Sequence, residues 1–229
     1  MNEMFSRSAR VIGESGLRKL NTSSVIVFGL GGVGGAACEA LVRAGVGTIG
    51  IVDKDVVDIT NINRQIIAIT ETVGIKKTDA TEKRMLSINP DVKIKKYDLF
   101  YLPETADEID LNEYDFVLDC IDNVTAKIEL VVRCEKSGVP VISSMGTGNK
   151  LSPDMLEISD IYKTSVCPLA RVVRRELKNR GIKKLPVVYS KEAPVKTDSS
   201  VPGSTSFTPP VAGYLMCSYV VKKLIEEVL

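Results

Sequence analysis

The sequence predicts an α/β protein with a doubly wound, Rossmann-like and mostly parallel sheet, helices on both faces and an N-terminal helical arm. Three observations support this fold class. The buried run Val25–Phe28 enters a glycine-rich turn that opens a helix. Strand-like apolar segments then alternate with helical patterns along the chain. Acidic residues follow several of these strands, at the sheet edge where such folds bind ligands.

The elements follow in order from the arm. Apolar residues recur at helical spacing from Phe5 to Leu20, interleaved with arginines, which indicates a helix before the first strand. The helix after the glycine-rich turn runs from about Val33 to Ala44, where glycines stop it. Further helices are predicted at 76–87, 124–137, 168–180 and 211–229. Further strands are predicted at 48–53, 92–97, 114–120, 139–144, 155–161 and 185–190.

We interpret the 229 residues, of which 44% are hydrophobic, as one domain. It comprises a helical arm at 1–22, a nucleotide-binding core at 23–150 and a substrate- or RNA-facing part at 151–229. Within the last part, the segment 191–210 is rich in Ser, Thr, Pro and Gly. This composition predicts either a mobile loop over the site or a disordered connector.

Composition excludes several classes of function. The net charge is only +1, so any contact with nucleic acid needs a local basic patch. No apolar run is long enough to span a membrane, and we expect a cytoplasmic protein without membrane contact. The chain has no histidine and no CxxC pair among its five cysteines, which argues against a histidine base, a disulfide framework and a structural zinc site.

The glycine-rich turn Gly29-Leu30-Gly31-Gly32-Val33-Gly34 predicts a nucleotide site. We expect Gly29 and Gly31 to allow a tight turn and Gly34 to allow close helix packing. A helix begun in this way directs unpaired N–H groups at an anion. Asp53 ends the next strand about 20 residues later, the spacing at which a carboxylate accepts hydrogen bonds from ribose.

Charged residues beyond the turn indicate a triphosphate rather than a dinucleotide. Cleavage of a triphosphate needs Arg, Lys and a metal ion held by a carboxylate. Arg64, Lys77 and Asp122 lie on three successive segments near one sheet edge. The alternative is an NAD-linked oxidoreductase or a non-catalytic nucleotide-binding protein, which needs only the turn and Asp53.

Together these segments resemble the ubiquitin-activating-like, ThiF-type ATP-binding superfamily, whose simpler members activate sulfur-carrier proteins. The resemblance covers most of residues 1–150 and implies adenylation of a carboxylate with ATP and Mg²⁺. The matching segments are Gly29–Gly34, Asp53, Thr60-Asn61-Ile62-Asn63-Arg64-Gln65 with Gly74-Ile75-Lys76-Lys77, and Asp119-Cys120-Ile121-Asp122-Asn123.

The resemblance implies a role for each matching residue. Asp53 holds the ribose, and Asn61, Arg64 and Lys77 hold the phosphates. Asp122 holds the magnesium ion. The remaining nucleotide contacts that it implies are Gly29, Gly31, Gly32, Gly34, Gln65 and Asn123.

The resemblance to this superfamily also implies a homodimer. The resemblance implies that an arginine of the arm reaches the partner's triphosphate as a catalytic residue. Arg7 fits that position by ungapped alignment, with Arg10 as the alternative. A sulfur-relay protein is a further partner that the resemblance leaves open.

The second half of the chain indicates which carboxylate is adenylated. Sulfur-carrier activators have two CxxC zinc pairs, which this sequence lacks. It is instead similar to tRNA threonylcarbamoyladenosine dehydratases, which adenylate the threonyl carboxylate of a modified tRNA adenosine and cyclise it with loss of water. The alternative remains an adenylyltransferase for a ubiquitin-like sulfur carrier. The similar segments are Ala9–Glu14, Ile88-Asn89-Pro90, Asp160–Thr164 with Pro168-Leu169-Ala170, and Val201–Phe207.

Two features of this half allow either a functional or a structural interpretation. Cys167 precedes a predicted helix start and is either a thioester nucleophile or a packing residue, whereas the other cysteines fall on apolar faces. A basic cluster either neutralises RNA phosphates or forms a solvated helix face. Its members are Arg171, Arg174, Arg175, Lys178, Arg180, Lys183 and Lys184.

Overall fold

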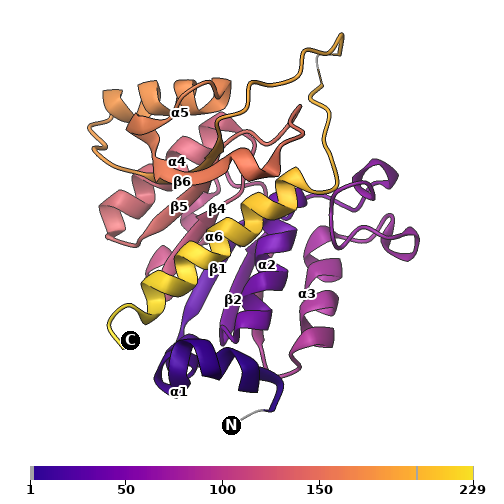
Figure 1. Cartoon of the computed structure of the whole chain (residues 1–229), viewed down its shortest axis with the longest axis vertical. Helices are drawn as coiled ribbons and strands as arrows, with labels where there is room; N and C mark the ends of the chain where they lie inside the picture. Colours follow the sequence, from indigo (N-terminus) through magenta and orange to yellow (C-terminus); the bar gives the residue numbers. More distant parts are fainter. Residues whose placement is uncertain (1–2, 200, 229) are drawn as a thin grey trace.

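The computed structural model describes residues 3–199 and 201–228. Within them, seven strands form one sheet in the order β3-β2-β1-β4-β5-β7-β6 (Figure 1). All neighbouring strands are parallel except β6, which is antiparallel to β7. This confirms the predicted sheet. The strands are β1 (Ser24–Phe28), β2 (Thr48–Val52), β3 (Lys93–Tyr97), β4 (Phe116–Asp119), β5 (Val141–Ser144), β6 (Leu156–Asp160) and β7 (Pro186–Ser190).

The described residues form six α-helices beside the sheet, and each falls close to its predicted range. The first is interrupted at Gly13, whose φ of 72° and ψ of 166° are not helical. The last begins at Thr208, earlier than predicted, because a proline suits the first turn of a helix. None of the helices in the described residues is both long and apolar enough to cross a bilayer. The helices are α1 (Ser6–Thr22), α2 (Gly32–Ala44), α3 (Lys77–Ile88), α4 (Val124–Ser137), α5 (Pro168–Asn179) and α6 (Thr208–Ile225).

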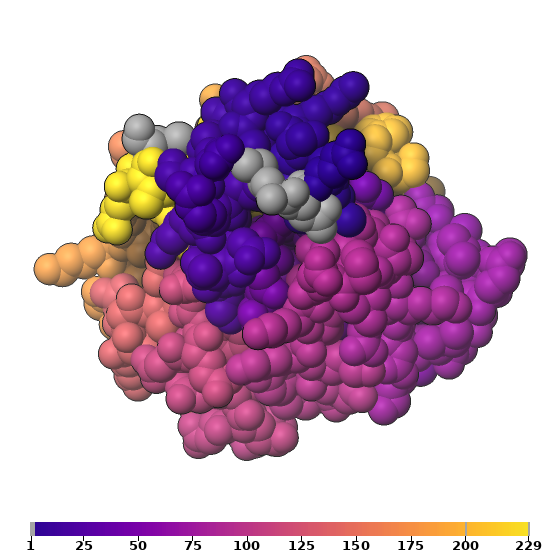
Figure 2. All heavy atoms as spheres, turned by 90° about the horizontal axis from the view of Figure 1, so that it is seen from below, coloured from indigo at the N-terminus to yellow at the C-terminus, as the bar shows by residue number. Residues whose placement is uncertain are grey.

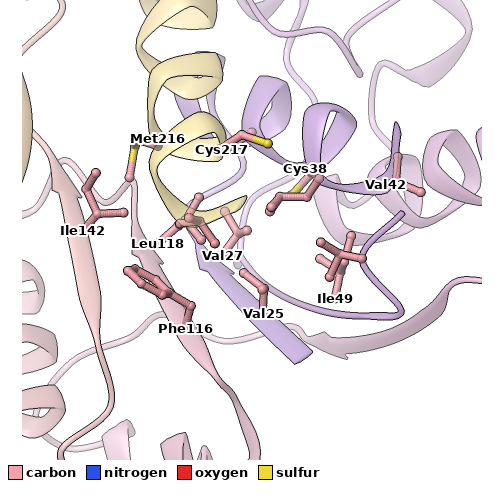
Figure 3. Packing of buried hydrophobic residues seen from close by; sticks show 14 of the residues in the cluster. Val25, Val27, Cys38, Val42, Ile49, Phe116, Leu118, Ile142, Met216 and Cys217 are labelled. Atoms are coloured by element: carbon pink, nitrogen blue, oxygen red, sulfur yellow. The ribbon is translucent and has the colours of Figure 1, made fainter. Parts of the chain in front are cut away.

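The core has a layer on each face of the sheet, and the alternation of residues along β1 explains why. Val25 and Val27 belong to a buried cluster with residues of α2 and α6, which Figure 3 shows at close range. Ile26 and Phe28 point to the opposite face, where α4 packs. Because a strand is fully buried only if both faces are covered, β1 is apolar at every one of these positions.

The strand order places a ligand crevice between β1 and β4. The chain proceeds from β1 through α2 to β2 and β3 at one edge, then returns to β4 and continues toward the other edge. The segments that follow β1 and β4 therefore lead away in opposite directions. Open α/β sheets bind ligands at such a point, outside the carboxyl ends of the strands. The glycine-rich turn and the segment 120–123 both begin there.

The helical arm lies at the opposite, amino end of the strands (Figure 1). Figure 2 shows the arm in indigo on the face of the molecule seen from below. Phe5 packs near Gly45, which ends α2, so this part of the arm is far from the start of that helix. A groove of about 940 Å³ separates α1 from the residues that begin β2 and β3. This groove is therefore distinct from the crevice between β1 and β4.

Candidate functional site

The turn after β1 requires glycine at two positions. Gly29 has a φ of 85°, and a Cβ atom there would lie 2.9 Å from the carbonyl oxygen of Cys120. A Cβ atom on Gly34 would lie 1.8 Å from the carbonyl oxygen of Gly29. The first turn of α2 is thus pressed against the preceding turn, as expected for Gly34. No side chain caps this helix, so its first N–H groups remain available to an anion.

Gly31 has a different role from the predicted one. Its φ of −72° and ψ of −156° are accessible to other residues, so the tight turn does not depend on it. A Cβ atom there would meet no neighbour closer than Nε2 of Gln65, at 4.0 Å. The expectation that Gly31 is needed for the turn is therefore wrong. The missing side chain leaves open space over the start of α2.

Asp53 is attached to the glycine-rich turn. Its Oδ2 accepts a hydrogen bond of 2.7 Å from the N–H of Leu30, and its Oδ1 accepts one of 2.9 Å from the N–H of Asp55. Burial raises the pKa of Asp53 and outweighs the opposing effects of Lys77 and of these backbone donors. The carboxyl group is thus held beside the glycine-rich turn.

Lys77 is the buried first residue of α3, and its ammonium lies near the carboxylates of Asp53 and Asp55. Its Nζ lies 2.9 Å from Oδ2 of Asp55 and 3.8 Å from Oδ1 of Asp53. The neighbouring Lys76 is exposed and instead pairs with Asp98 at 2.8 Å. Of two adjacent lysines, only Lys77 therefore faces the crevice.

The turn at 58–65 holds the next candidates. Asn61 is buried, and its Oδ1 accepts a 3.1 Å hydrogen bond from the N–H of Asp58. Arg64 is half-buried and donates 2.9 Å hydrogen bonds to the carbonyl oxygen of Thr60 and to Oδ1 of Asn63. Its Cγ would lie 3.4 Å from a Cβ atom on Gly32, so Arg64 lies against the start of α2.

Gln65 is buried beside Gly31, and its Oε1 has no hydrogen-bond partner among the described residues. A buried amide oxygen without a partner costs about 1–3 kcal/mol. A group that hydrogen-bonds with it would remove this cost. This unpaired oxygen, together with the space above Gly31, fits a ligand at the start of α2.

The segment after β4 presents Asp122 at the same edge. The N–H of Cys120 donates to the carbonyl oxygen of Phe28 at 2.9 Å, which attaches the segment to the end of β1. Asn123 caps α4 by accepting a 3.0 Å hydrogen bond from the N–H of Ala126. Asp122 is exposed between them. In the described part of the chain, no cluster of three or more acidic or cysteine residues could itself hold a metal ion.

Two buried lysines near this edge were not identified as candidates from the sequence. Lys127 pairs with Asp119 at 2.7 Å, and both side chains are fully buried. Its position on the apolar face of α4, beside Leu130 and Val131, is the signal that could have identified it. Lys150 donates to the carbonyl oxygen of Glu192 at 2.7 Å, and burial lowers its pKa.

Residues 203 and 204, which lie between β7 and α6, contact two other loops. Asn149 donates from its N–H to the carbonyl oxygen of Gly203 at 2.8 Å, and its side chain accepts from the N–H of Gly203 at 2.6 Å. Nδ2 of Asn63 donates to the carbonyl oxygen of Ser204 at 3.0 Å. The segment thus connects the turn at 58–65 with the loop after β5. Its mobility stays a prediction.

The structure does not bring Arg7 or Arg10 to the other candidates. Both are exposed on the first part of α1, near Phe5 at the far end of α2. The 13 residues of α2 span about 20 Å. An arginine of the arm can therefore serve this kind of site only in another copy of the chain.

The structure divides the basic cluster of α5 into internal and free members. Arg174 donates to the carbonyl oxygen and Oγ1 of Thr164 at 2.9 and 2.7 Å, so it supports a turn. Arg175 and Arg180 both pair with Glu176. The members that are exposed and form no ion pair with a described residue are Arg171, Lys178, Lys183 and Lys184.

The cysteines are mainly packing residues. Cys167 is buried at the start of α5, and its Sγ would lie 3.7 Å from a Cβ atom on Gly146. Cys38, Cys134 and Cys217 are buried in the core, and burial raises the pKa of Cys217 to about 12. Burial of Cys167 favours the packing interpretation of that residue.

Comparisons with known proteins identify the family and the fold. The profile of the ThiF family matches residues 5–227. A tRNA threonylcarbamoyladenosine dehydratase of Bacillus subtilis is 41% identical over 246 residues, covering 100% of this chain and 97% of that protein. The crystal structure of an E. coli tRNA N6-threonylcarbamoyladenosine dehydratase with AMP has a TM-score of 0.93 at 31% identity. The corresponding complex with ATP has a TM-score of 0.91 at 30% identity, and both cover 98% of this chain and 95% of the other. The predicted resemblance and fold class are confirmed.

Proposed function

The chain belongs to the ThiF family, and from this premise we propose that it is an ATP-dependent tRNA threonylcarbamoyladenosine dehydratase. The observation that carries the proposal is the convergence of Asp53, Arg64 and Lys77 on the start of α2. A hydride carrier would not need these two cations. The sulfur-carrier alternative is less well supported, because the sequence lacks CxxC pairs and Cys167 is buried.

ATP fits the site at the start of α2. The phosphates would approach the open space above Gly31, and Gly29, Gly32 and Gly34 shape the turn around them. Asp53 would accept hydrogen bonds from the ribose hydroxyls. Asn61, Gln65 and Asn123 would supply side-chain amide groups for further contacts with ATP.

Asp122 would hold Mg²⁺ bound to the ATP phosphates. A single carboxylate suits this ion, because Mg²⁺ retains water and phosphate oxygens in its coordination shell. When bound, the ion neutralises negative charge on the phosphate oxygens. The exposed position of Asp122 at the sheet edge leaves room for those ligands.

Lys77 and Arg64 would act on the charge that develops during adenylation. The threonyl carboxylate attacks the α-phosphorus, a new carboxyl-oxygen-to-phosphorus bond forms, and the bond to pyrophosphate breaks. Lys77 can transfer its hydrogen bonds from Asp55 to phosphate oxygens, and Arg64 can exchange its backbone acceptor for phosphate. Both cations thus stabilise the departing pyrophosphate.

The second step requires positioning more than a strong base. A nearby nucleophilic nitrogen of the modified adenosine attacks the adenylated carbonyl carbon and loses its proton to solvent, and AMP leaves as the ring closes. Intramolecular closure gains its rate from proximity. The chain has no histidine, in agreement with a step that does not depend on one.

We further infer a homodimer in which Arg7 of each chain reaches the triphosphate bound by its partner. This inference is supported by the position of the arm, about 20 Å from the turn of its own chain. Arg10 is the alternative donor. A sulfur-relay protein remains a proposed further partner. We also propose a cytoplasmic location, because the proposed substrate is a tRNA.

The function is tested by supplying the purified protein with ATP, Mg²⁺ and tRNA that carries threonylcarbamoyladenosine. We expect AMP and pyrophosphate to be released and the nucleoside to lose the mass of one water, as measured by mass spectrometry. Unmodified tRNA serves as the control and should give no AMP. Release of pyrophosphate only with a ubiquitin-like carrier that ends in Gly-Gly would support the alternative instead.

The free cations of α5 are expected to contribute to tRNA binding. Changing Arg171 and Lys178 to Glu should raise the KM for tRNA about 10-fold or more at 50 mM salt and reduce the salt dependence of binding, because phosphate contacts release counterions. The KM for ATP should not change. The matched control is Arg175→Glu with Glu176→Arg, which keeps the local charge. Equal effects on both substrates would contradict an RNA-binding role.

A further inference from the structure

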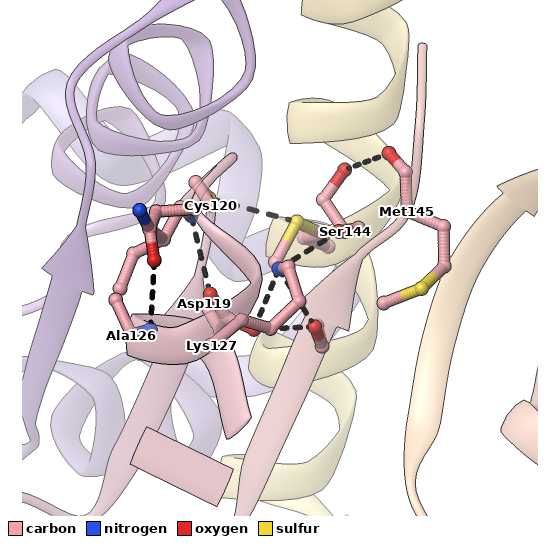
Figure 4. Close-up of polar contacts among 10 residues, drawn as sticks. Asp119, Cys120, Ala126, Lys127, Ser144 and Met145 are labelled. Atoms are coloured by element: carbon pink, nitrogen blue, oxygen red, sulfur yellow. Dashed lines mark hydrogen bonds and ion pairs between the residues drawn. The ribbon is translucent and has the colours of Figure 1, made fainter. Parts of the chain in front are cut away.

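A fully buried ion pair lies beneath the segment that carries Asp122. Asp119 ends β4, Lys127 lies in the first turn of α4, and their side chains have no exposed surface. Nζ of Lys127 is 2.7 Å from Oδ2 of Asp119 (Figure 4). A cation in the first turn meets the positive end of the helix dipole, and burial removes its hydration. Lysine is therefore a costly residue at this position.

The surroundings of Lys127 satisfy its ammonium group completely. Besides Asp119, Nζ donates to Oγ of Ser143 and to the carbonyl oxygen of Ser144, each at 3.0 Å. These three acceptors match the three N–H donors of an ammonium. The hydroxyl of Ser143 also donates to Oδ2 of Asp119. The side chain thus joins α4 to the carboxyl ends of β4 and β5.

The other oxygen of Asp119 holds the segment itself. Its Oδ1 accepts a 3.1 Å hydrogen bond from the N–H of Ile121. At the other end, the carbonyl oxygen of Asn123 accepts a 3.0 Å hydrogen bond from the N–H of Lys127. Residues 120–123 are therefore fastened at both ends. The ion pair between Asp119 and Lys127 joins those two ends and closes a ring.

Asp122 belongs to the segment that this ring includes, and the position of its backbone depends on the ring. Its side chain is exposed and makes no hydrogen bond or ion pair with a described residue. Only the backbone of the segment determines where its carboxylate lies. A shift of about 1 Å in a catalytic group can cost about 100-fold in rate. The ring thus contributes to the location of Asp122, together with the hydrogen bond from Cys120 to Phe28 and the helix cap of Asn123.

We propose that Lys127 is a positioning residue for adenylation, which acts through Asp119 to fix the segment 120–123 and thereby Asp122. The proposal rests on the proposed role of Asp122 in holding Mg²⁺ with ATP. Buried ion pairs are often no more stabilising than apolar residues of similar volume. Stability alone therefore does not explain an ammonium at this position, whereas a fixed segment at the ligand crevice does.

The test compares Lys127→Met with the double variant Lys127→Met and Asp119→Asn. The single variant leaves a buried carboxylate unpaired and should unfold at a clearly lower temperature. The double variant has no buried charge, and its unfolding temperature should return close to that of the wild type. Its amide oxygen can still accept from Ile121. Any remaining defect in the double variant therefore reports on the lost connection.

Two measurements on the double variant report on position rather than on folding. Amide hydrogen exchange of residues 120–126, measured without ATP or metal, should be about 10-fold faster or more than in the wild type. The rate constant for pyrophosphate exchange should fall about 10–100-fold, with a smaller change in the KM for ATP. Ser143→Ala removes one acceptor and no charge, so it gives a milder version of the same test if the double variant does not fold.

The matched control removes another ion pair of α4, Arg133→Met with Glu129→Gln, whose charged atoms lie 2.6 Å apart. This control should change neither measurement. A folded double variant that exchanges residues 120–126 at the wild-type rate, or that adenylates at the wild-type rate, would overturn the proposal. Asp122→Asn tests the proposed function separately: full activity would reject the role of Asp122, while the exchange measurement would still decide whether Lys127 holds the segment.

Discussion

Replacing Lys77 with Gln is expected to reduce adenylation about 100- to 1000-fold. The reason is that a preorganised cation aimed at developing charge contributes this much to a rate in a buried site. Lys77 is buried at the start of α3, and its ammonium lies 3.8 Å from Oδ1 of Asp53 beside the glycine-rich turn. The measurement is the ATP–pyrophosphate exchange rate and the release of AMP with modified tRNA as substrate.

The adjacent Lys76 provides a matched control for this prediction. It precedes Lys77 in the sequence, but its side chain is exposed and pairs with Asp98 on the other side of the helix start. Lys76→Gln should therefore retain activity within about twofold, because a surface ion pair contributes little. The unfolding temperature of both variants should be recorded, since Lys77 also neutralises Asp55. Retention of more than a fifth of the activity by Lys77→Gln would reject the assigned role.

Replacing Gly34 with Ala is expected to lower the free energy of unfolding by about 3 kcal/mol or more, which corresponds to a decrease in Tm of about 6–12 °C. The added Cβ atom would lie 1.8 Å from the carbonyl oxygen of Gly29. Both groups belong to the backbone at the start of α2, so neither can rotate away. Thermal unfolding followed by circular dichroism measures the effect.

Two neighbouring glycines separate this structural effect from a loss of ligand binding. Gly35→Ala should leave stability nearly unchanged, since its Cβ atom would meet Cγ2 of Ile66 at an ordinary 3.5 Å. Gly31→Ala should also fold, because the nearest neighbour of its Cβ atom would be 4.0 Å away. However, Gly31→Ala should weaken ATP binding about 10-fold or more by filling the space for phosphate, as calorimetry can measure. Unchanged affinity would show that phosphate does not approach Gly31.

The order of elements could be predicted because it depends on local patterns. The apolar run of β1, the glycines after it and the helical spacing of α2 together determine a strand, a turn and a helix without knowledge of the rest of the chain. The alternation of such units then restricts the sheet to a parallel, doubly wound arrangement. Motif spacing also identified Asp53, and the resemblance to the ThiF-type superfamily identified Arg64 and Lys77; the structure places all three around the start of α2.

Some details could not be read from those patterns, because they depend on which atoms come close in space. The expected reason for Gly31 was wrong because backbone dihedral angles follow from the whole turn rather than from residue type. The basic cluster could not be divided until the structure showed that Arg174 supports the turn at Thr164. Similarly, the edge that holds Arg7 is determined by how the arm packs, not by its helical pattern.

The sequence by itself thus determined the α/β fold, the nucleotide turn and the residue types available for chemistry, because these follow from periodicity and from motif spacing. Only the tertiary structure revealed the pair of Lys127 and Asp119, the free side of α5 and the distance of the arm from its own crevice. The physical reason is that such contacts join residues through the packing of helices on strands. That packing brings together side chains whose contact cannot be predicted from their separation along the sequence.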